Sequence, residues 1–239
     1  MCGIIGFTGR LEAQKILTEG LAALEYRGYD SAGIAYFKDT GKISIRKTVG
    51  KVKDLLAICD DDNNSTCGIG HTRWATHGGV TNANAHPHKV GNVALIHNGI
   101  IENYHEIVNK FDLADSLVSE TDTEVAAALI NKLYDGDPKA TLKKAVKEIT
   151  GSFAFCVMFK DQPGKIFAIR NVVILAPSAA RISTKRSSAC AVTADTSCHS
   201  CSSSTSAWRV VSTSGKRVRT AVDTSFLTPS CSDKARIAC

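Results

Sequence analysis

The chain has 239 residues and a formal net charge of +6, and 44% of its residues are hydrophobic, enough for one large domain or two small ones. No apolar run approaches the length of a membrane span or a signal peptide, so we expect a cytoplasmic protein that contacts no membrane. In a reducing cytosol the nine cysteines are not expected to form a disulfide framework.

The positive charge is concentrated in the last third of the chain. Residues 1–170 carry 20 Lys and Arg against 20 Asp and Glu, whereas residues 171–239 carry nine against three. The same segment holds 23 Ser and Thr and five of the nine cysteines, and its apolar residues show no sustained period. We therefore expect a folded domain over 2–170 and a Ser/Thr/Arg/Cys-rich tail over 171–239. Because aromatic residues are almost absent from the tail, we do not expect it to bind nucleic acid.

Hydrophobic periodicity over the first 170 residues predicts more strands than crossover helices, with several strands joined by tight turns. Strands are expected over 4–7, 33–37, 42–48, 67–71, 92–97, 152–159 and 165–170. Helices are expected over 12–25, 52–58, 103–111, 121–134 and 141–149. This order favours an α+β fold in which helices cover mostly antiparallel sheets.

The second residue is a cysteine, and removal of Met1 would make Cys2 the N-terminus. Its thiol, a strong nucleophile, and its α-amine would then belong to one residue. An α-amine has a pKa of about 7.7–8.0, which suits a general base near neutrality. Taken alone, Cys2 could equally be an ordinary strand cysteine, and the polar segments described next favour the nucleophile.

A first polar segment, 71–79, follows a predicted strand. Arg73 could bind a carboxylate through two parallel hydrogen bonds, and Trp74 could cover a pocket. The alternative is a polar connection with one surface arginine, which such a dense polar run makes less favourable. Two neighbouring histidines, His86 and His88, could suggest a metal site, but no cysteines or carboxylates lie at a ligand spacing from them.

A second polar segment, 97–103, is expected to be a loop after a strand. Asn-Gly alone usually marks a turn. Here the Asn98 side-chain amide and the Gly99 backbone N–H could instead form an oxyanion hole, and glycine would let a substrate approach the backbone.

A third polar segment, 119–124, opens a predicted helix. Ser119 and Asp122 have the spacing of a capping box, which explains the segment without any function. A carboxylate at this position could also bind a substrate ammonium group, and the two roles are compatible.

Together with the Cys2 start, these segments resemble the class II glutamine amidotransferases, which are N-terminal nucleophile hydrolases. The resemblance is closest to the glutaminase domain of the glutamine–fructose-6-phosphate aminotransferases, and it covers about residues 2–170. Two alternatives remain: the related amidophosphoribosyltransferases, and a truncated, inactive fragment. The motifs that carry the resemblance are CGIIG from Cys2, LEYRGYDSAG from Leu24, GHTRWATHG from Gly70, HNGIIENY from His97 and SETDTE from Ser119.

The resemblance implies a four-layer αββα sandwich and hydrolysis of L-glutamine to glutamate and ammonia through a thioester. It implies neither a metal nor an organic cofactor. In this resemblance Cys2 is the nucleophile and its α-amine the base, and Asn98 and Gly99 form the oxyanion hole. By the same resemblance Arg73 binds the α-carboxylate of glutamine, Asp122 binds its α-amino group, and the pocket is lined by Thr76 and His77. The resemblance also implies that Trp74 gates the path of the ammonia and that Arg27 organises the loop beside the nucleophile.

The resemblance ends after Arg170. The family continues with a Ser-Pro-Leu segment and then a strand that ends in Ala-Ser-Asp, and this sequence contains neither. We therefore hypothesise that the reading frame changes near Asn171. The sugar-isomerase domains that would use the ammonia to aminate fructose 6-phosphate to glucosamine 6-phosphate are not found either. The sequence makes no prediction of oligomeric state.

Overall fold

The computed structural model describes residues 2–38, 40–59, 64–75 and 78–171, together with the backbone of 190–193, 209–212 and 237–238. For Arg27 it describes the backbone but not the side chain. The predicted site residues Thr76 and His77 therefore lie outside the described residues, as do the Arg27 side chain and most of the predicted tail.

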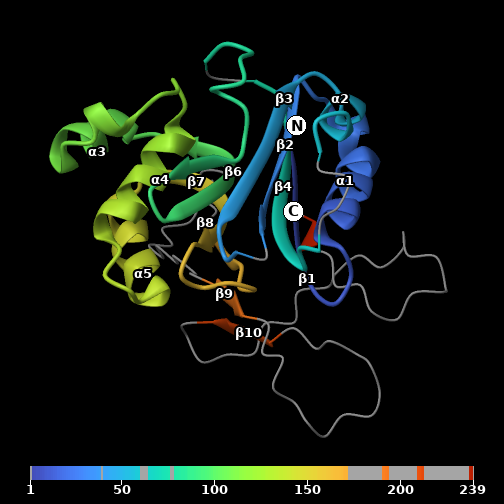
Figure 1. Cartoon of the computed structure of the whole chain (residues 1–239). Coiled ribbons are helices and arrows are strands. Elements are labelled where there is room, and N and C mark those ends of the chain that lie inside the picture. Colours follow the sequence, from blue (N-terminus) through green and yellow to red (C-terminus); the bar gives the residue numbers. More distant parts are fainter. Residues whose placement is uncertain are drawn as a thin grey trace, which may run out of the picture.

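Two antiparallel sheets form the centre of the fold (Figure 1), one in the order β11-β1-β4-β2-β3 and the other in the order β5-β6-β7-β8. A separate two-stranded sheet pairs β10 with β9. The strands are β1 (Gly3–Thr8), β2 (Ser31–Phe37), β3 (Ile43–Val49), β4 (Cys67–Arg73), β5 (His88–Val90), β6 (Val93–Ile101), β7 (Gly151–Phe159), β8 (Phe167–Asn171), β9 (Cys190–Thr193), β10 (Arg209–Ser212) and β11 (Ile237–Ala238).

Helices cover the outer face of each of the two large sheets (Figure 1). Helices α1 and α2 pack on the first sheet, and α3, α4 and α5 pack on the second. This is the predicted four-layer αββα sandwich, so the predicted fold class is confirmed. The helices are α1 (Ala13–Leu24), α2 (Val52–Leu56), α3 (Tyr104–Phe111), α4 (Asp122–Leu133) and α5 (Pro138–Glu148), with short 3-10 turns at Glu25–Arg27 and Ala114–Ser116.

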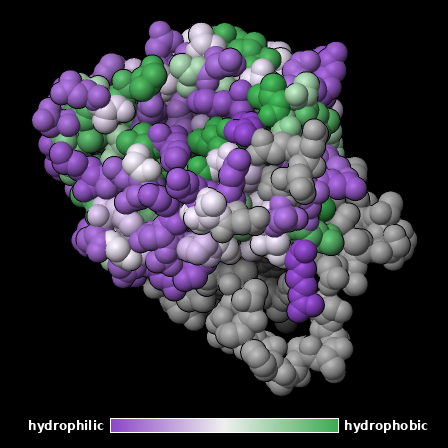
Figure 2. Space-filling view, in the orientation of Figure 1, coloured by the Kyte–Doolittle hydropathy of each residue, from purple (hydrophilic) through white to green (hydrophobic). Residues whose placement is uncertain are grey.

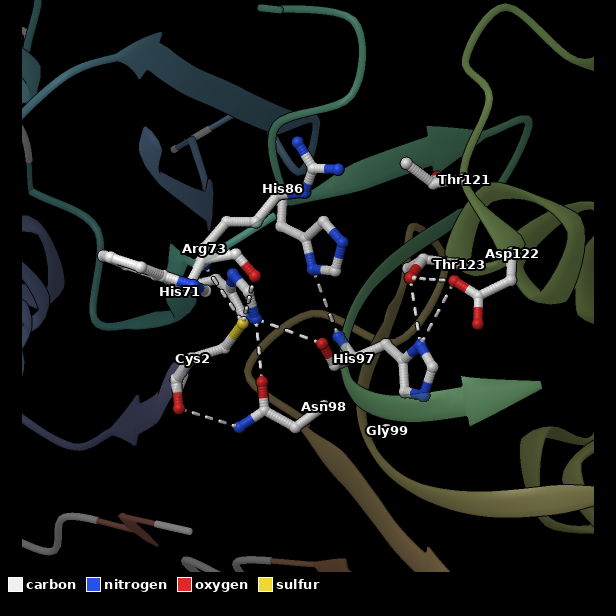
Figure 3. A pocket seen from close by; sticks show the side chains of 11 residues that line it. Cys2, His71, Arg73, His86, His97, Asn98, Gly99, Thr121, Asp122 and Thr123 are labelled. Atoms are coloured by element: carbon white, nitrogen blue, oxygen red, sulfur yellow. Dashed lines mark hydrogen bonds and ion pairs between the residues drawn. The ribbon is translucent and has the colours of Figure 1, made fainter. Parts of the chain in front are cut away.

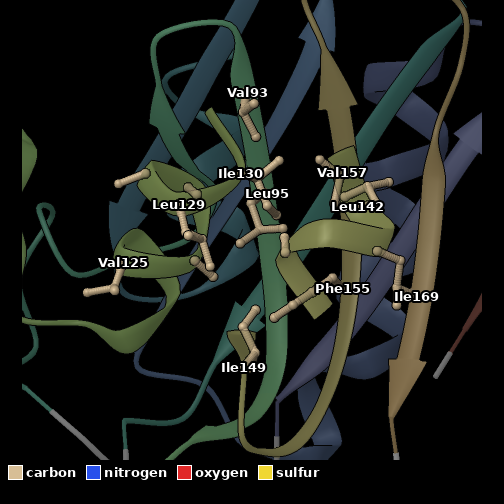
Figure 4. Packing of buried hydrophobic residues seen from close by; sticks show 14 of the residues in the cluster. Val93, Leu95, Val125, Leu129, Ile130, Leu142, Ile149, Phe155, Val157 and Ile169 are labelled. Carbon is tan, nitrogen blue, oxygen red and sulfur yellow. The ribbon is translucent and has the colours of Figure 1, made fainter. Parts of the chain in front are cut away.

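The alternation of side chains along each strand separates the layers of the core. In β1, Ile4 lies in the cluster between the two sheets, whereas Ile5 belongs to the cluster under α1. In β6, Leu95 packs with residues of α4 and α5 (Figure 4), whereas Ile96 belongs to the cluster between the sheets. These strands are therefore apolar on both faces, which is why their sequences contain short continuous apolar runs.

The face that α3, α4 and α5 present in the view of Figure 2 is mainly polar. Figure 2 shows hydrophilic side chains over much of the face formed by α3, α4 and α5, with small hydrophobic patches between them. Scattered apolar residues of this kind are normal for a protein surface. In the described part of the chain, no helix is both long enough and apolar enough to cross a bilayer.

The predicted elements of the first 170 residues are present, and the main differences concern strand ends near the site. Strand β6 continues to Ile101, so Asn98 and Gly99 lie within a strand and the predicted loop is wrong. The reason is the pairing of β6 with β7, which extends to Ile101 opposite Gly151. Helix α5 begins earlier than predicted because Asp137 accepts hydrogen bonds from two backbone N–H groups of its first turn. Strand β5 was not predicted.

Three short strands lie in the segment predicted to be a tail. Strand β11 pairs with β1 at the edge of the first sheet, with Ile5 opposite Ala238, and the other two strands pair with each other. None of these three strands pairs with β7 or β8. The side chains of this segment lie outside the described residues, so the expectation that they bury few apolar contacts stays a prediction.

Candidate active site

A cavity lies where the ends of β1 and β4 meet β6 and the start of α4 (Figure 3). Strands β1 and β4 are antiparallel neighbours in one sheet, whereas β6 belongs to the other. The cavity therefore forms between the two sheets, and five segments of sequence contribute to it. Six residues selected from the sequence line it: Cys2, Arg73, Trp74, Asn98, Gly99 and Asp122.

The thiol of Cys2 faces the backbone of Trp74. The Trp74 N–H donates a hydrogen bond to Cys2 Sγ at 3.2 Å, and Sγ lies 3.6 Å from the Trp74 carbonyl oxygen. The next residue is held as well, because the Gly3 N–H donates to Thr72 Oγ1 at 3.1 Å. The backbone of Trp74 and the side chain of Thr72 thus fix the position of Cys2 at the start of β1.

The side chain of Trp74 is about half exposed, at 53%, and its ring packs over Gly28. A Cβ at Gly28 would collide with this ring, and the Gly28 φ of +104° also favours glycine. The loop that carries Trp74 is also held by Asp30, because the Ala75 N–H donates a hydrogen bond to Asp30 Oδ2. Trp74 thus lines the cavity with its backbone beside the thiol and its ring partly exposed.

The side-chain amide of Asn98 lies between Cys2 and His71 (Figure 3). Its Nδ2 donates to the Cys2 carbonyl oxygen at 3.2 Å, and its Oδ1 lies 3.0 Å from His71 Nε2. The neighbouring Gly99 has a φ of +134°, and a Cβ there would collide with the Ser152 carbonyl oxygen of β7. Only glycine fits this position of the strand.

Arg73 ends β4 and is buried, with 5% of its surface exposed. Its Nη1 donates to the Gly79 carbonyl oxygen at 3.1 Å. The carboxylate of Glu120 accepts from Asn84 Nδ2 at 3.0 Å and from the Gly79 N–H at 3.2 Å. These hydrogen bonds, with the nearby Arg73 charge, lower the pKa of Glu120 and keep it ionised.

Asp122 is the first residue of α4, where the positive end of the helix dipole favours a carboxylate. Its Oδ2 accepts from the Ile101 N–H at 2.9 Å, which joins α4 to β6. The residue that caps the helix is Thr121, whose side chain accepts from the Glu124 N–H, so the capping box predicted from Ser119 is wrong by two positions. The capping role therefore falls to Thr121, and one oxygen of Asp122 is directed to the strand.

Sequence analysis missed a cluster of buried histidines, three of which, His71, His86 and His97, line the cavity. The rings of His71 and His86 are 4.1 Å apart, and those of His86 and His88 are 4.9 Å apart. Burial lowers the pKa of His71 and His88 to about 3 and that of His97 to about 4, although nearby Asp122 raises the last. All three are therefore neutral near pH 7. The sequence signal was available, because His71 and His97 flank the residues selected as functional.

The buried histidines do not form a metal centre. Within the part of the chain that the structure describes, no group of three or more His, Cys, Asp and Glu side chains could hold a metal ion. Their contacts are instead with one another, with threonines and with backbone: His97 Nδ1 lies 3.0 Å from Thr123 Oγ1, and His88 Nε2 lies 3.1 Å from Thr121 Oγ1.

A family model described as a glutamine amidotransferase domain matches residues 71–180. The match spans the end of β4, all of β6 and the start of α4, which supply most of the cavity. This chain contains a glutamine amidotransferase domain. The glutamine amidotransferase family predicted from the motifs is thereby confirmed.

Curated relatives of this glutamine amidotransferase domain are named as isomerizing glutamine–fructose-6-phosphate aminotransferases. The protein of Fusobacterium nucleatum is 53% identical over 178 residues, which are 72% of this chain and 29% of the relative. The protein of Aquifex aeolicus is 48% identical over 176 residues, 71% of this chain and 29% of the relative. The chain thus spans less than a third of the length of these relatives.

Solved structures show the same fold. A glutamine phosphoribosylpyrophosphate amidotransferase from B. subtilis is similar with a TM-score of 0.60 and 27% identity, over 71% of this chain and 37% of that chain. A structure described as the allosteric regulatory enzyme of purine biosynthesis has a TM-score of 0.61 and 28% identity, over the same shares. The glutamine amidotransferase sandwich is therefore common to enzymes with different names.

Proposed function

We propose that this domain hydrolyses L-glutamine to L-glutamate and ammonia, with Cys2 as the nucleophile. The observation that carries the proposal is a single cavity lined by a thiol, a side-chain amide and two opposite charges, those of Arg73 and Asp122. A free amino acid has a carboxylate and an ammonium group. Arg73 suits the first through its planar guanidinium, and Asp122 suits the second. The side-chain amide of glutamine then extends to Cys2.

The chemistry proceeds in two stages. After removal of Met1, the thiol proton passes to the α-amine of Cys2, and Sγ bonds to the side-chain amide carbon of glutamine. The electron pair of the C=O bond moves to oxygen, where the Asn98 Nδ2 and the Gly99 N–H stabilise the negative charge. The intermediate collapses, the amine returns the proton to the leaving nitrogen, and ammonia departs. Water then hydrolyses the thioester to glutamate and restores the thiol.

Other residues hold proposed roles on the basis of the motifs. Trp74 gates the path of the ammonia, a role that its place in the cavity lining and its half-exposed side chain support. Thr76 and His77 line the glutamine pocket and Arg27 organises the loop beside the nucleophile; these three side chains lie outside the described residues.

The direct test is release of ammonia and glutamate from glutamine by the purified chain, with hydroxylamine added to capture the thioester. Wild-type protein should give glutamate, ammonia and γ-glutamylhydroxamate, and the matched Cys2→Ala variant should give none. An intact, folded chain that forms no hydroxamate and releases no ammonia would overturn the proposal.

We further propose fructose 6-phosphate as the ammonia acceptor in a longer protein that contains this domain. The support is the name shared by relatives that are 53% and 48% identical. The rival acceptor is a phosphoribosyl group, which the name of the B. subtilis structural relative suggests. Joining residues 1–170 to the remainder of the Fusobacterium relative distinguishes them: glutamine-dependent formation of glucosamine 6-phosphate is expected, and a hybrid that hydrolyses glutamine without forming it would contradict the proposal.

The change in composition at Asn171 supports a last proposal, that residues 171–239 do not belong to the amidotransferase domain because the reading frame changes there. The segment has no Glu, three Asp and five cysteines, unlike the 170 residues before it. Translation of the nucleotide sequence in the other two frames should recover the Ser-Pro-Leu and Ala-Ser-Asp segments. Their absence from both frames would contradict the proposal.

A further inference from the structure

The side chain of His71 contacts the backbone of one residue and the side chain of the next. Its Nε2 lies 3.0 Å from the His97 carbonyl oxygen and 3.0 Å from Asn98 Oδ1. A carbonyl oxygen is an acceptor only, so Nε2 must carry the proton and donate to it. The tautomer of His71 is therefore determined by a backbone group of β6.

This tautomer also determines which way the Asn98 amide faces. A protonated Nε2 cannot accept a hydrogen bond, so Asn98 must present its oxygen to His71 and not its nitrogen. The amide nitrogen then faces the opposite side, where it donates to the Cys2 carbonyl oxygen at 3.2 Å (Figure 3). One fixed proton on the ring thus directs the only N–H donors of this side chain toward the nucleophile's residue.

The other ring nitrogen shows that this arrangement is not simply good packing. His71 is 1% exposed, and its Nδ1 is buried without a hydrogen-bond partner in the structure. Buried polar atoms are nearly always paired, and an unpaired one in a core is unfavourable for folding. An apolar side chain at this position would avoid that penalty, so the histidine has a use that stability alone does not supply.

Burial keeps the ring neutral, and it lowers the pKa of His71 to about 3. The groups that face the ring are His86, against which it packs, His97, Asn98 and the charge of Arg73. A neutral ring carries one ring proton only, so its orienting hydrogen bonds do not change across the physiological pH range.

We infer that His71 is a positioning residue, which holds the Asn98 amide with its N–H donors directed toward Cys2 and so assembles the oxyanion hole. The inference rests on the proposed glutamine hydrolysis. If His71 acted on stability alone, its loss would weaken the fold without a specific effect on the transition state. If it positions Asn98, its loss should act through Asn98 and on kcat, since the oxyanion forms only in the transition state.

The test is a double-mutant cycle on the full chain, with kcat and KM for glutamine measured for each variant. His71→Leu should lower kcat about tenfold or more and change KM less than about twofold. His71→Gln, which can place an N–H near the position of Nε2, should restore part of kcat. In an Asn98→Ala background, His71→Leu should lower kcat by less than about twofold, because the group it positions is already gone.

A matched control separates positioning from loss of stability. Ile69 is fully buried on the same strand and face, two residues before His71, and lies outside the cavity. Ile69→Ala should lower the melting temperature at least as much as His71→Leu while kcat stays within about twofold of wild type. Unchanged kcat in folded His71→Leu, or effects of His71→Leu and Asn98→Ala that multiply fully, would overturn the inference.

Two further outcomes are decided by nitrogen NMR of the wild-type chain. If neither His71 variant folds, the ring should still show a proton on Nε2 and none on Nδ1, and the opposite tautomer would overturn the inference. If the wild type hydrolyses no glutamine, the proposed function fails. The NMR measurement still tests the inference, because the tautomer of His71 and the orientation of the Asn98 amide show whether His71 directs this group.

Discussion

The backbone N–H of Trp74 donates a hydrogen bond to the sulfur of Cys2 at 3.2 Å, across 72 positions of sequence. The contact exists because β1 and β4 are antiparallel neighbours, with Gly3 opposite Thr72. Cys2 precedes the first of these strands and Trp74 follows the second, so the two ends meet. The pairing of these two strands therefore sets the environment of the Cys2 sulfur.

Asp30 should prove important for activity although it does not line the cavity. Its carboxylate accepts from the Ala75 N–H and from Ser31 Oγ, and thereby holds the loop that carries Trp74 against Cys2. Asp30→Ala should lower kcat/KM about tenfold, which corresponds to about 1.4 kcal/mol. Asp137→Ala is the control, because Asp137 also accepts two N–H groups but caps α5. A smaller effect of Asp30→Ala than of the control on kcat/KM would contradict this role.

A glutamine-like electrophile should label Cys2 and spare the buried cysteines. Cys2 is partly exposed, whereas Cys67 and Cys156 are buried, and burial raises the pKa of the Cys67 thiol to about 12. Intact mass should show loss of Met1, and peptide mapping should place the label on Cys2. Excess glutamine should slow the labelling of Cys2. Labelling of Cys59 by iodoacetamide is the control, and glutamine should not change its rate. Label on Cys67 or Cys156 with Cys2 unmodified would refute the assignment.

Replacing either charged group of the cavity should weaken glutamine binding more than turnover. Arg73→Ala and Asp122→Asn each remove a charge-assisted contact worth about 1.5–3 kcal/mol, so KM should rise about tenfold or more. Asparagine is chosen because it can still accept from the Ile101 N–H, which the native carboxylate does at 2.9 Å. Lys139→Ala, an exposed change on α5, is the control. An unaltered KM in both site variants would exclude the proposed binding of glutamine by Arg73 and Asp122.

Asn98→Ala and Gly99→Ala should reduce turnover for different reasons. The first removes a donor that acts mainly in the transition state, so kcat should fall about 100-fold, with a change in stability that reflects the loss of two hydrogen bonds, to Cys2 and from His71. The second forces a Cβ against Ser152 at a φ of +134°, so the melting temperature should fall together with kcat. Steady-state kinetics and thermal unfolding of both variants give the comparison. Wild-type kcat in folded Asn98→Ala would remove the oxyanion role.

The buried histidines should make the fold sensitive to acid. Their pKa values are lowered in the folded state, to about 3 for His71 and His88 and about 4 for His97, against about 6.5 when unfolded. Between about pH 6.5 and pH 4 the unfolded chain therefore binds protons that the folded chain does not. Stability is fully present above pH 6.5 and should fall below it, by about 1.4 kcal/mol per pH unit for each histidine.

Urea unfolding at a series of pH values measures this dependence. His88→Gln is a suitable variant, since it removes one titrating ring and should reduce the slope of unfolding free energy against pH below 6.5. Its stability at pH 7 is expected to fall too, because the hydrogen bond between His88 Nε2 and Thr121 Oγ1 is lost. A wild-type slope of zero between pH 6.5 and 4.5 would show that these rings do not stay neutral.

The sequence by itself predicted most of the strands and helices, the family, and six of the residues that line the cavity. The periods of the apolar residues predicted the strands and helices, because each side chain faces either the apolar core or the solvent. The sequence pointed to Cys2 by its position after Met1, and to Arg73, Asn98 and Asp122 by the dense polar segments that contain them. The cavity brings these four residues together.

Only the tertiary structure decided how these residues are held. The register of β6 on β7 puts Asn98 and Gly99 inside a strand, which local sequence cannot reveal because Asn-Gly favours a turn in isolation. The hydrogen bonds of His71 join β4 of one sheet to His97 and Asn98 of β6 in the other sheet. Such contacts depend on side chains that are distant in sequence and close in space, so their hydrogen-bond directions become defined only when the two sheets pack together.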